Sequence, residues 1–270
     1  MFERVLIPTD FSPYADKTLE CGFELKNLGV REVLLLHVID PEPLVEYIDA
    51  FYGADMPKML DDLRKRAKDK LEERVKMLKD QGIDAKYEIA IGDPATEIVK
   101  ASEGISLILI GAKGKNALSA TFLGSVSEAV IKSSKVPVLV TKLKVIEKKD
   151  GAYYCELIYG RMFDKVLYAT DFSECSKVEE IMDGYPKEIV ILHVLEKGEN
   201  MEDIRSKLEK IRFNNAEYVV VEGKPCREIL NVSDDMKCTM IVVGRSKVEG
   251  FFGTTVDCVV RRSKIPVLIV

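Results

Sequence analysis

The segment Phe2–Ser12 reads FERVLIPTDFS, and the segment Phe163–Ser173 reads FDKVLYATDFS. Each has a short apolar run that is typical of a buried strand, followed by Thr-Asp-Phe-Ser. Three more matching pairs follow in the same order along the chain. They are Leu36–Val38 with Leu192–Val194, Gly92–Pro94 with Gly223–Pro225, and Val136–Val140 with Ile265–Ile269. The chain therefore contains two copies of one unit, and the second copy is the shorter.

Strands and helices are expected to alternate in each copy. In the first copy the expected strands are Arg4–Pro8, Glu32–Ile39, Tyr87–Ile91, Leu107–Ile110 and Val136–Thr141. The expected helices are Pro13–Leu28, Lys58–Gln81, Pro94–Ser102 and Ser125–Ser133. Continuous apolar strands separated by helices indicate a parallel sheet that is covered on both faces. We predict two tandem doubly wound α/β domains, each a five-stranded parallel sheet with helices on both faces. Their limits are 1–143 and 162–270, and 144–161 is a linker, with or without a short strand of its own.

Composition narrows the class of protein. The 270 residues include 40 Lys and Arg and 45 Asp and Glu, so the net charge is −5 and a nucleic-acid partner is not expected. No apolar run approaches the roughly 20 residues that span a bilayer, and the N-terminus leads directly into a strand rather than a signal peptide. We expect a cytoplasmic protein without a membrane partner. The six Cys are scattered, and reduced thiols are expected rather than a disulfide framework.

Ligands of open parallel sheets bind at the carboxyl ends of the strands. Gly111 follows the fourth expected strand, and a helix is expected to begin at Ser125 after a glycine-containing loop. Glycine permits left-handed backbone and a close approach of amides to an anion, and a helix N-terminus favours phosphate. The alternative is that these glycines only turn the chain and that Ser125 only caps a helix. Neither a Walker A loop nor a G-x-G-x-x-G segment is present.

His37 and Ser12, which lie near strand ends, are interpreted as structural residues. His37 has its counterpart in His193, so packing or a hydrogen bond to the backbone is expected of both. Ser12 is better placed than Asp10 to cap the helix that begins at Pro13.

Taken together, these segments resemble the universal stress protein family over nearly the whole chain, most specifically in the first copy. In the nucleotide-binding branch, the resemblance implies that the protein binds an adenine nucleotide. The nucleotide is either ATP or AMP, with or without bound Mg²⁺. The resemblance also implies that Asp10 lies near the adenine and ribose and Val38 beside the adenine, and that the glycine loop surrounds the ribose and phosphates. Lys113 stands where similar sequences often have His. The implied binding residues are Pro8, Thr9, Asp10, Val38, Gly111, Lys113, Gly114, Gly124, Ser125, Val126 and Ser127.

The second copy keeps only part of this pattern. Its loop from Gly244 to Gly253 is shorter, and Lys247 replaces the second glycine. We therefore expect triphosphate binding in the first copy only. The second copy is either empty or takes a smaller nucleotide such as AMP. Its candidate residues are Asp171, Val194, Gly244, Gly253 and Thr254.

Three functions remain open at this point. A regulatory nucleotide-binding protein is favoured over a slow ATP hydrolase, because no complete catalytic set is evident and no catalytic residue is assigned. Asp10 and Asp40 are candidate holders of Mg²⁺ in the second case. The third function is a structural pseudo-dimer without a ligand. We also expect the copies to pair through their closing strands as an intrachain pseudo-dimer, and we leave open a homodimer and an unidentified protein partner.

Overall fold

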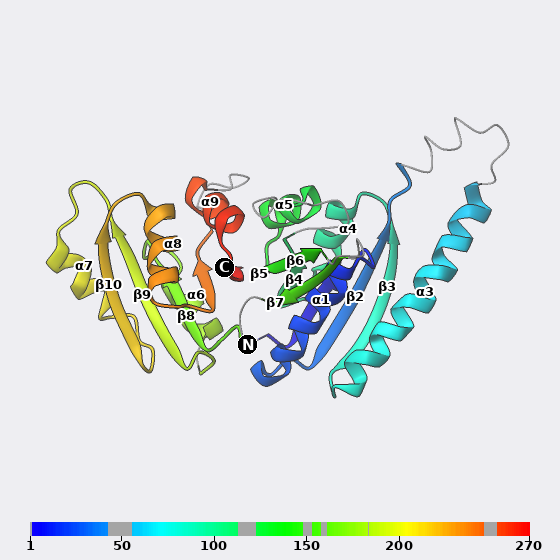
Figure 1. Ribbon diagram of the computed structural model, residues 1–270, viewed down its shortest axis with the longest axis horizontal. Helices are drawn as coiled ribbons and strands as arrows, with labels where there is room; N and C mark the ends of the chain where they lie inside the picture. Colours follow the sequence, from blue (N-terminus) through cyan, green and yellow to red (C-terminus); the bar gives the residue numbers. More distant parts are fainter. Residues whose placement is uncertain are drawn as a thin grey trace. The chain divides into compact units, whose positions relative to one another are not determined.

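The computed structural model describes residues 2–42, 56–112, 123–147, 153–157, 161–182, 184–245 and 253–270. Strands and helices alternate along both copies, as Figure 1 shows. The residues form two compact units whose limits differ from those of the copies. The N-terminal unit holds the described residues from Phe2 to Val136 except Leu123, and the C-terminal unit holds Leu123 and those from Pro137 to Val270. The domain limits expected at residues 143 and 161 stay predictions.

The N-terminal unit has a parallel sheet in the order β4-β1-β2-β3, with helices between the strands. Its strand interiors are apolar and buried, as the continuous apolar runs predict. Helix α3 lies along β3 in Figure 1 and contacts it. The elements are β1 (Arg4–Pro8), α1 (Pro13–Cys21), a 3₁₀ helix (Gly22–Leu28), β2 (Glu32–Ile39), α3 (Met56–Asp80), β3 (Asp84–Ile91), α4 (Pro94–Ala101), β4 (Leu107–Gly111) and α5 (Ser125–Ser133).

Local sequence signals set the ends of these helices. Ser12 caps α1 by accepting a hydrogen bond from the Ala15 amide, as expected. Gly29 follows the 3₁₀ helix with a φ of 78°, a left-handed conformation that glycine adopts without strain. The single helix expected over Pro13–Leu28 is thus correct in extent, but it is α-helical only as far as Cys21.

Two pairs of helices cover the sheet of the N-terminal unit. Arg74 of α3 forms an ion pair with Asp16 of α1, with 2.6 Å between Nη2 and Oδ1, so these helices lie on the same face. Helices α4 and α5 contact each other. Helices on both faces of a parallel sheet make this the doubly wound fold that the sequence predicts.

The C-terminal unit contains the second copy and the closing strand of the first. Its sheet has the order β10-β9-β8-β11-β12-β5, in which the five strands of the second copy are parallel. Its elements are β5 (Val138–Thr141), β6 (Leu143–Glu147), β7 (Tyr153–Leu157), β8 (Lys165–Ala169), α6 (Cys175–Met182), β9 (Glu188–Leu195), α7 (Met201–Leu208), β10 (Ala216–Glu222), α8 (Pro225–Asp235), β11 (Met240–Val243), α9 (Thr254–Arg262) and β12 (Val267–Ile269).

The two closing strands pair as expected. Strand β5 runs antiparallel to β12, with Val140 opposite Val267 and Val138 opposite Ile269. Lys142, just after β5, is buried and donates a hydrogen bond from Nζ to the carbonyl oxygen of Val260 in α9. The segment expected as a linker forms more structure than one short strand, because β6 and β7 pair as an antiparallel hairpin. Among the described residues, no helix is long and apolar enough to cross a membrane.

The expectation that all cysteines are reduced is wrong. Cys226 in the first turn of α8 and Cys258 in α9 form a disulfide, with 6.0 Å between their Cα atoms. They are 32 positions apart, and only the fold brings them together. Cys21, Cys175 and Cys238 form no disulfide in the part of the chain that the structure describes, as expected of scattered thiols.

Removing this disulfide should destabilise the C-terminal unit. The bond closes a loop of moderate length, and such bonds typically contribute about 2–4 kcal/mol to the free energy of unfolding. We expect Cys226→Ala/Cys258→Ala to lose that amount relative to the oxidised protein, measured by denaturant unfolding followed by circular dichroism. Dithiothreitol should lower the stability of the parent protein and leave the double variant unchanged. Equal stabilities of the oxidised parent and the double variant would contradict the prediction.

Candidate functional site

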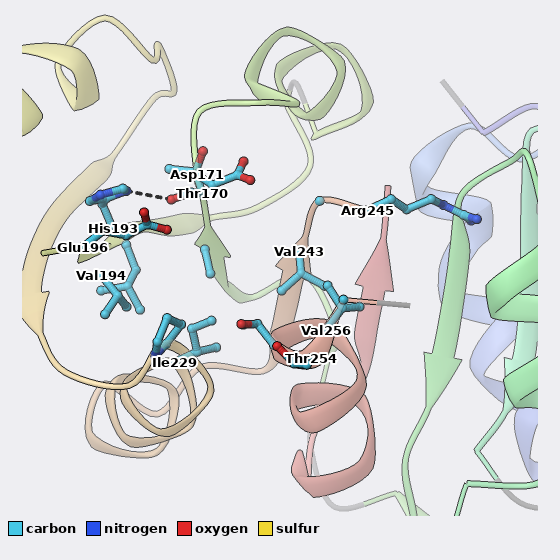
Figure 2. Close-up of a pocket in the computed structure, with 16 residues that line it drawn as sticks. Thr170, Asp171, His193, Val194, Glu196, Ile229, Val243, Arg245, Thr254 and Val256 are labelled. Carbon is cyan, nitrogen blue, oxygen red and sulfur yellow. Dashed lines mark hydrogen bonds between the residues drawn. The ribbon is translucent and has the colours of Figure 1, made fainter. Parts of the chain in front are cut away.

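A cavity of about 260 Å³ lies at the carboxyl ends of the strands in the C-terminal unit. Its walls come from the ends of β8, β9 and β11 and from the first turns of α8 and α9, as Figure 2 shows. Strands β8 and β11 are neighbours in the sheet but are not consecutive in the chain. The order of the strands reverses between them, and ligands of doubly wound sheets bind at such a switch point.

Part of the cavity wall is apolar. Val194 of β9 and Ile229 of α8 lie on one side of the cavity in Figure 2, and Val243 of β11 and Val256 of α9 on the other. All four side chains are buried in the fold. Such a surface suits the faces of a flat organic ring, while the polar groups at the rim fix its orientation.

The turn after β8 holds a carboxylate at the rim. The Thr170 amide donates to the Leu192 carbonyl oxygen at 2.9 Å, which ties the end of β8 to β9. Phe172 has a φ of 67°, and its amide donates to Oγ1 of Thr170 at 2.8 Å. Oδ1 of Asp171 accepts from the Ser173 amide at 2.9 Å. Asp171 is thus fixed at the cavity while its carboxylate stays exposed.

His193 supports this turn from the neighbouring strand. Its Nδ1 donates to the Thr170 carbonyl oxygen at 2.9 Å, the bond dashed in Figure 2, and its Nε2 lies 2.8 Å from Oε2 of Glu199. The hydrogen bond to His193 is the main cause that lowers the pKa of Glu199 below its ordinary value. The ring also stacks on Phe172, with 4.8 Å between centroids. The expected structural role of this histidine is confirmed.

The N-terminus of α9 forms another wall. The helix begins at Thr254 after Gly253, whose position provides no side-chain cap. Thr254 and Thr255 both line the cavity. The backbone amides of a first helical turn and the helix dipole favour an anion at this place.

The first copy repeats the same construction. The Thr9 amide donates to the Leu36 carbonyl oxygen at 2.8 Å, Phe11 has a φ of 60°, and Oδ1 of Asp10 accepts from the Ser12 amide at 3.0 Å. Nδ1 of His37 donates to the Thr9 carbonyl oxygen at 2.8 Å, which confirms the expected backbone hydrogen bond.

The strand ends and the start of α5 also come together in the first copy. The Gly124 amide donates to the Ala112 carbonyl oxygen at 2.9 Å, just after β4. Ser125 and Val126 form the first turn of α5, as expected, while Pro8 ends β1 and Val38 lies in β2. Lys113 and Gly114 lie outside the described residues, so their expected roles stay predictions.

The structure changes one expectation about this loop and adds a contact of Ser127. Gly124 has a φ of −64° and Gly253 a φ of −53°, so neither position requires glycine for its backbone. Only close approach of a ligand remains as a reason for glycine there. Ser127 is buried and donates from Oγ to the Gly111 carbonyl oxygen at 2.8 Å, so its hydroxyl ties α5 to the end of β4.

In the second copy, all five candidate residues line the one cavity. They are Asp171, Val194, Gly244, Gly253 and Thr254. Sequence reasoning missed the contribution of α8, which provides Pro225 and Ile229. The repeated Gly-x-Pro segment was the available signal. It also missed Arg245, whose side chain points away from Asp171 in Figure 2 and whose pKa is lowered by burial.

The candidate Mg²⁺ holders take part in local turns. Oδ1 of Asp40 accepts from the Glu42 amide at 3.0 Å, as Oδ1 of Asp10 does from Ser12. Within the described part of the chain, no three His, Cys, Asp or Glu side chains gather as a metal site would require. A metal held chiefly by ligand phosphates needs fewer protein groups.

Comparison with known proteins identifies the family of both copies. The model of the universal stress protein family matches residues 1–142 and 178–270. Universal stress protein MJ0577 of Methanocaldococcus jannaschii is 39% identical over 157 residues, which are 53% of this chain and 97% of that protein. Universal stress protein YxiE of Bacillus subtilis is 30% identical over 149 residues, covering 53% of this chain and 100% of that protein.

A solved structure extends the similarity to both copies. The crystal structure of a universal stress protein from Archaeoglobus fulgidus matches with a TM-score of 0.74 and 30% identity, over 98% of this chain and 95% of that one. The family model, these relatives and the doubly wound fold of both copies agree, and the chain belongs to the universal stress protein family.

Proposed function

We propose that this chain binds adenine nucleotides and acts as a regulatory protein whose state reports the bound nucleotide. The observation that carries the proposal is the cavity at the switch point of the second copy. It combines an apolar wall, a carboxylate at the rim and an uncapped helix N-terminus. A nucleotide has an aromatic base, ribose hydroxyls and phosphate, and each finds a chemically matched surface there.

Different residues of the cavity contact the base, the ribose and the phosphate of the nucleotide. Val194 and Ile229 offer apolar contacts for the faces of the base. The carboxylate of Asp171 accepts hydrogen bonds from ribose hydroxyls, which become charge-assisted. The first turn of α9 at Thr254 receives the phosphate.

The size of the cavity favours a small nucleotide in the second copy. Its volume of about 260 Å³ lies just below the roughly 300–1,000 Å³ typical of small-molecule sites. AMP is therefore our proposed ligand for the second copy. The first copy has the longer loop with Gly111, Gly114 and Gly124, and we assign ATP to it, with Mg²⁺ bound mainly by the phosphates. Slow ATP hydrolysis remains the alternative from the sequence, and no described contact favours it.

Calorimetric titration tests the proposal and its asymmetry. Titration with ATP and Mg²⁺ should give close to one tight site per chain, because only the first copy has the long glycine loop. Titration with AMP should reveal binding in the second copy. Two ATP sites of equal affinity would contradict the asymmetry, and a chain that binds neither nucleotide would be the structural pseudo-dimer instead.

A matched pair of glycine variants tests where the phosphate lies. Valine is compatible with the backbone at Gly124 and Gly253, since both have a negative φ, so folding should be retained. Its side chain should keep phosphate away from the helix N-terminus. Loss of a charge-assisted hydrogen bond costs about 1.5–3 kcal/mol, so we expect roughly tenfold or greater weakening. Gly124→Val should weaken ATP and Gly253→Val should weaken AMP, and unchanged affinities would show that the phosphate site is misplaced.

A second pair tests the rim carboxylates. Asp10→Asn and Asp171→Asn keep the side-chain oxygen that accepts from the amide two residues later, so the turn should persist. They remove the charge that strengthens a hydrogen bond to ribose. Each variant should weaken the nucleotide of its own copy roughly five- to tenfold in calorimetry, about 1–1.4 kcal/mol. Adenine alone should bind the parent and the variants alike, and a large effect on adenine would assign the carboxylates to the base.

A further inference from the structure

The two copies hold the helices beside their strand ends in different ways. In the first copy, Asp93 caps α4, and its Oδ1 accepts from the amide of Thr96 at 2.8 Å and from its Oγ1 at 2.5 Å. In the second copy, Lys224 takes the place of Asp93 and gives α8 no side-chain cap. The first turn of α8, which lines the cavity, therefore lacks the local restraint present in α4.

The disulfide lies in the first turn of α8, the helix that has no side-chain cap. Cys226 directly follows Pro225 of the cavity wall, and Cys258 lies one helical turn after Thr254 of the opposite wall. The bond thus joins the two helices that enclose the cavity. When the Gly-x-Pro segments and the closing strands of the copies are aligned, the equivalent positions of the first copy are Ala95 and Ala129, which cannot form a bridge.

We propose that Cys226 and Cys258 form a reversible redox site that sets the nucleotide affinity of the cavity in the C-terminal unit. This inference rests on the function proposed for that cavity. With the bond present, the walls are held in place before the ligand arrives. With the bond reduced, α8 and α9 have more freedom, and binding has to order them, which lowers affinity.

The cysteines are suited to exchange with a low-molecular-weight thiol or dithiol. Both are partly exposed, whereas Cys21 and Cys238 are buried and burial raises the pKa of Cys238 to about 11. A thiolate of a dithiol attacks one sulfur of the bridge, the S–S bond breaks, and a mixed disulfide forms. The second thiol of the dithiol then attacks the mixed disulfide. Two electrons and two protons pass to the protein, which gains two thiols, and the dithiol leaves as a cyclic disulfide. A small disulfide reverses the reaction.

One reporter can isolate this cavity from the first copy. The chain contains no Trp, so Glu196→Trp at the exposed rim places a single indole beside the cavity. AMP is titrated by Trp fluorescence into the oxidised protein and into the same protein after dithiothreitol. We expect reduction to weaken AMP at least about fivefold, the lower end of typical coupling between sites. Calorimetry of the Gly124→Val chain with its native Glu196 provides the same comparison without the reporter.

The matched control removes the bridge permanently. Cys226→Ala/Cys258→Ala gives the second copy the residues of the first, and it should bind AMP as weakly as the reduced protein and not respond to dithiothreitol. ATP binding in the first copy should not respond either. Circular dichroism must show the same fold in both redox states, and weaker binding together with unfolding would overturn the redox site.

The possible outcomes distinguish a failure of the redox site from a failure of the proposed nucleotide binding. Equal AMP affinity in the oxidised and reduced protein would overturn the redox site and leave nucleotide binding intact. A double variant that still responds to dithiothreitol would assign the response to another cysteine and overturn it too. AMP bound in neither state would overturn both the redox site and the function proposed for this cavity.

Discussion

A bulky residue with positive φ is held in place at the first strand end of both copies, and the candidate sites depend on it. Phe11 and Phe172 adopt φ values of 60° and 67°, which cost energy in any residue with a Cβ. A threonine hydroxyl accepts from each phenylalanine amide, and a histidine ring lies against each phenylalanine ring. That histidine also donates to the threonine carbonyl oxygen from the next strand. Without this support the turn would relax, and the aspartate carboxylate would leave the edge of the sheet.

Much of the fold could be predicted because its signals are local. The apolar runs of β1 and β4 and the glycine after α3 have one reasonable interpretation each. The His37 hydrogen bond was predictable because the second copy repeats the residue in the same context. The predictions that failed concern contacts in space. No spacing in the sequence pairs Cys226 with Cys258, and the contribution of Ile229 to the cavity depends on where the fold places α8.

The copies show how one fold can be maintained by different chemistry. Ser127 in the first copy uses its hydroxyl to tie α5 to the strand end, whereas the equivalent position in the second copy is Val256, which packs in the cavity wall. Asp93 caps α4, whereas α8 is joined covalently to α9. Each exchange preserves the position of a helix and alters the surface beside the strand ends. Divergence of the copies therefore changes the side chains beside the strand ends while the fold is kept.

The antiparallel pairing of β5 with β12 has a further consequence for how this protein behaves at low abundance. Between separate polypeptides, such a contact would weaken on dilution, because association depends on concentration. Here one chain carries both strands, so the second meets the first at an effective concentration set by the connecting segment alone. The apolar edge of β12 is thereby hidden from other chains at any expression level. The pairing of β5 with β12 therefore persists however few molecules of this protein a cell holds.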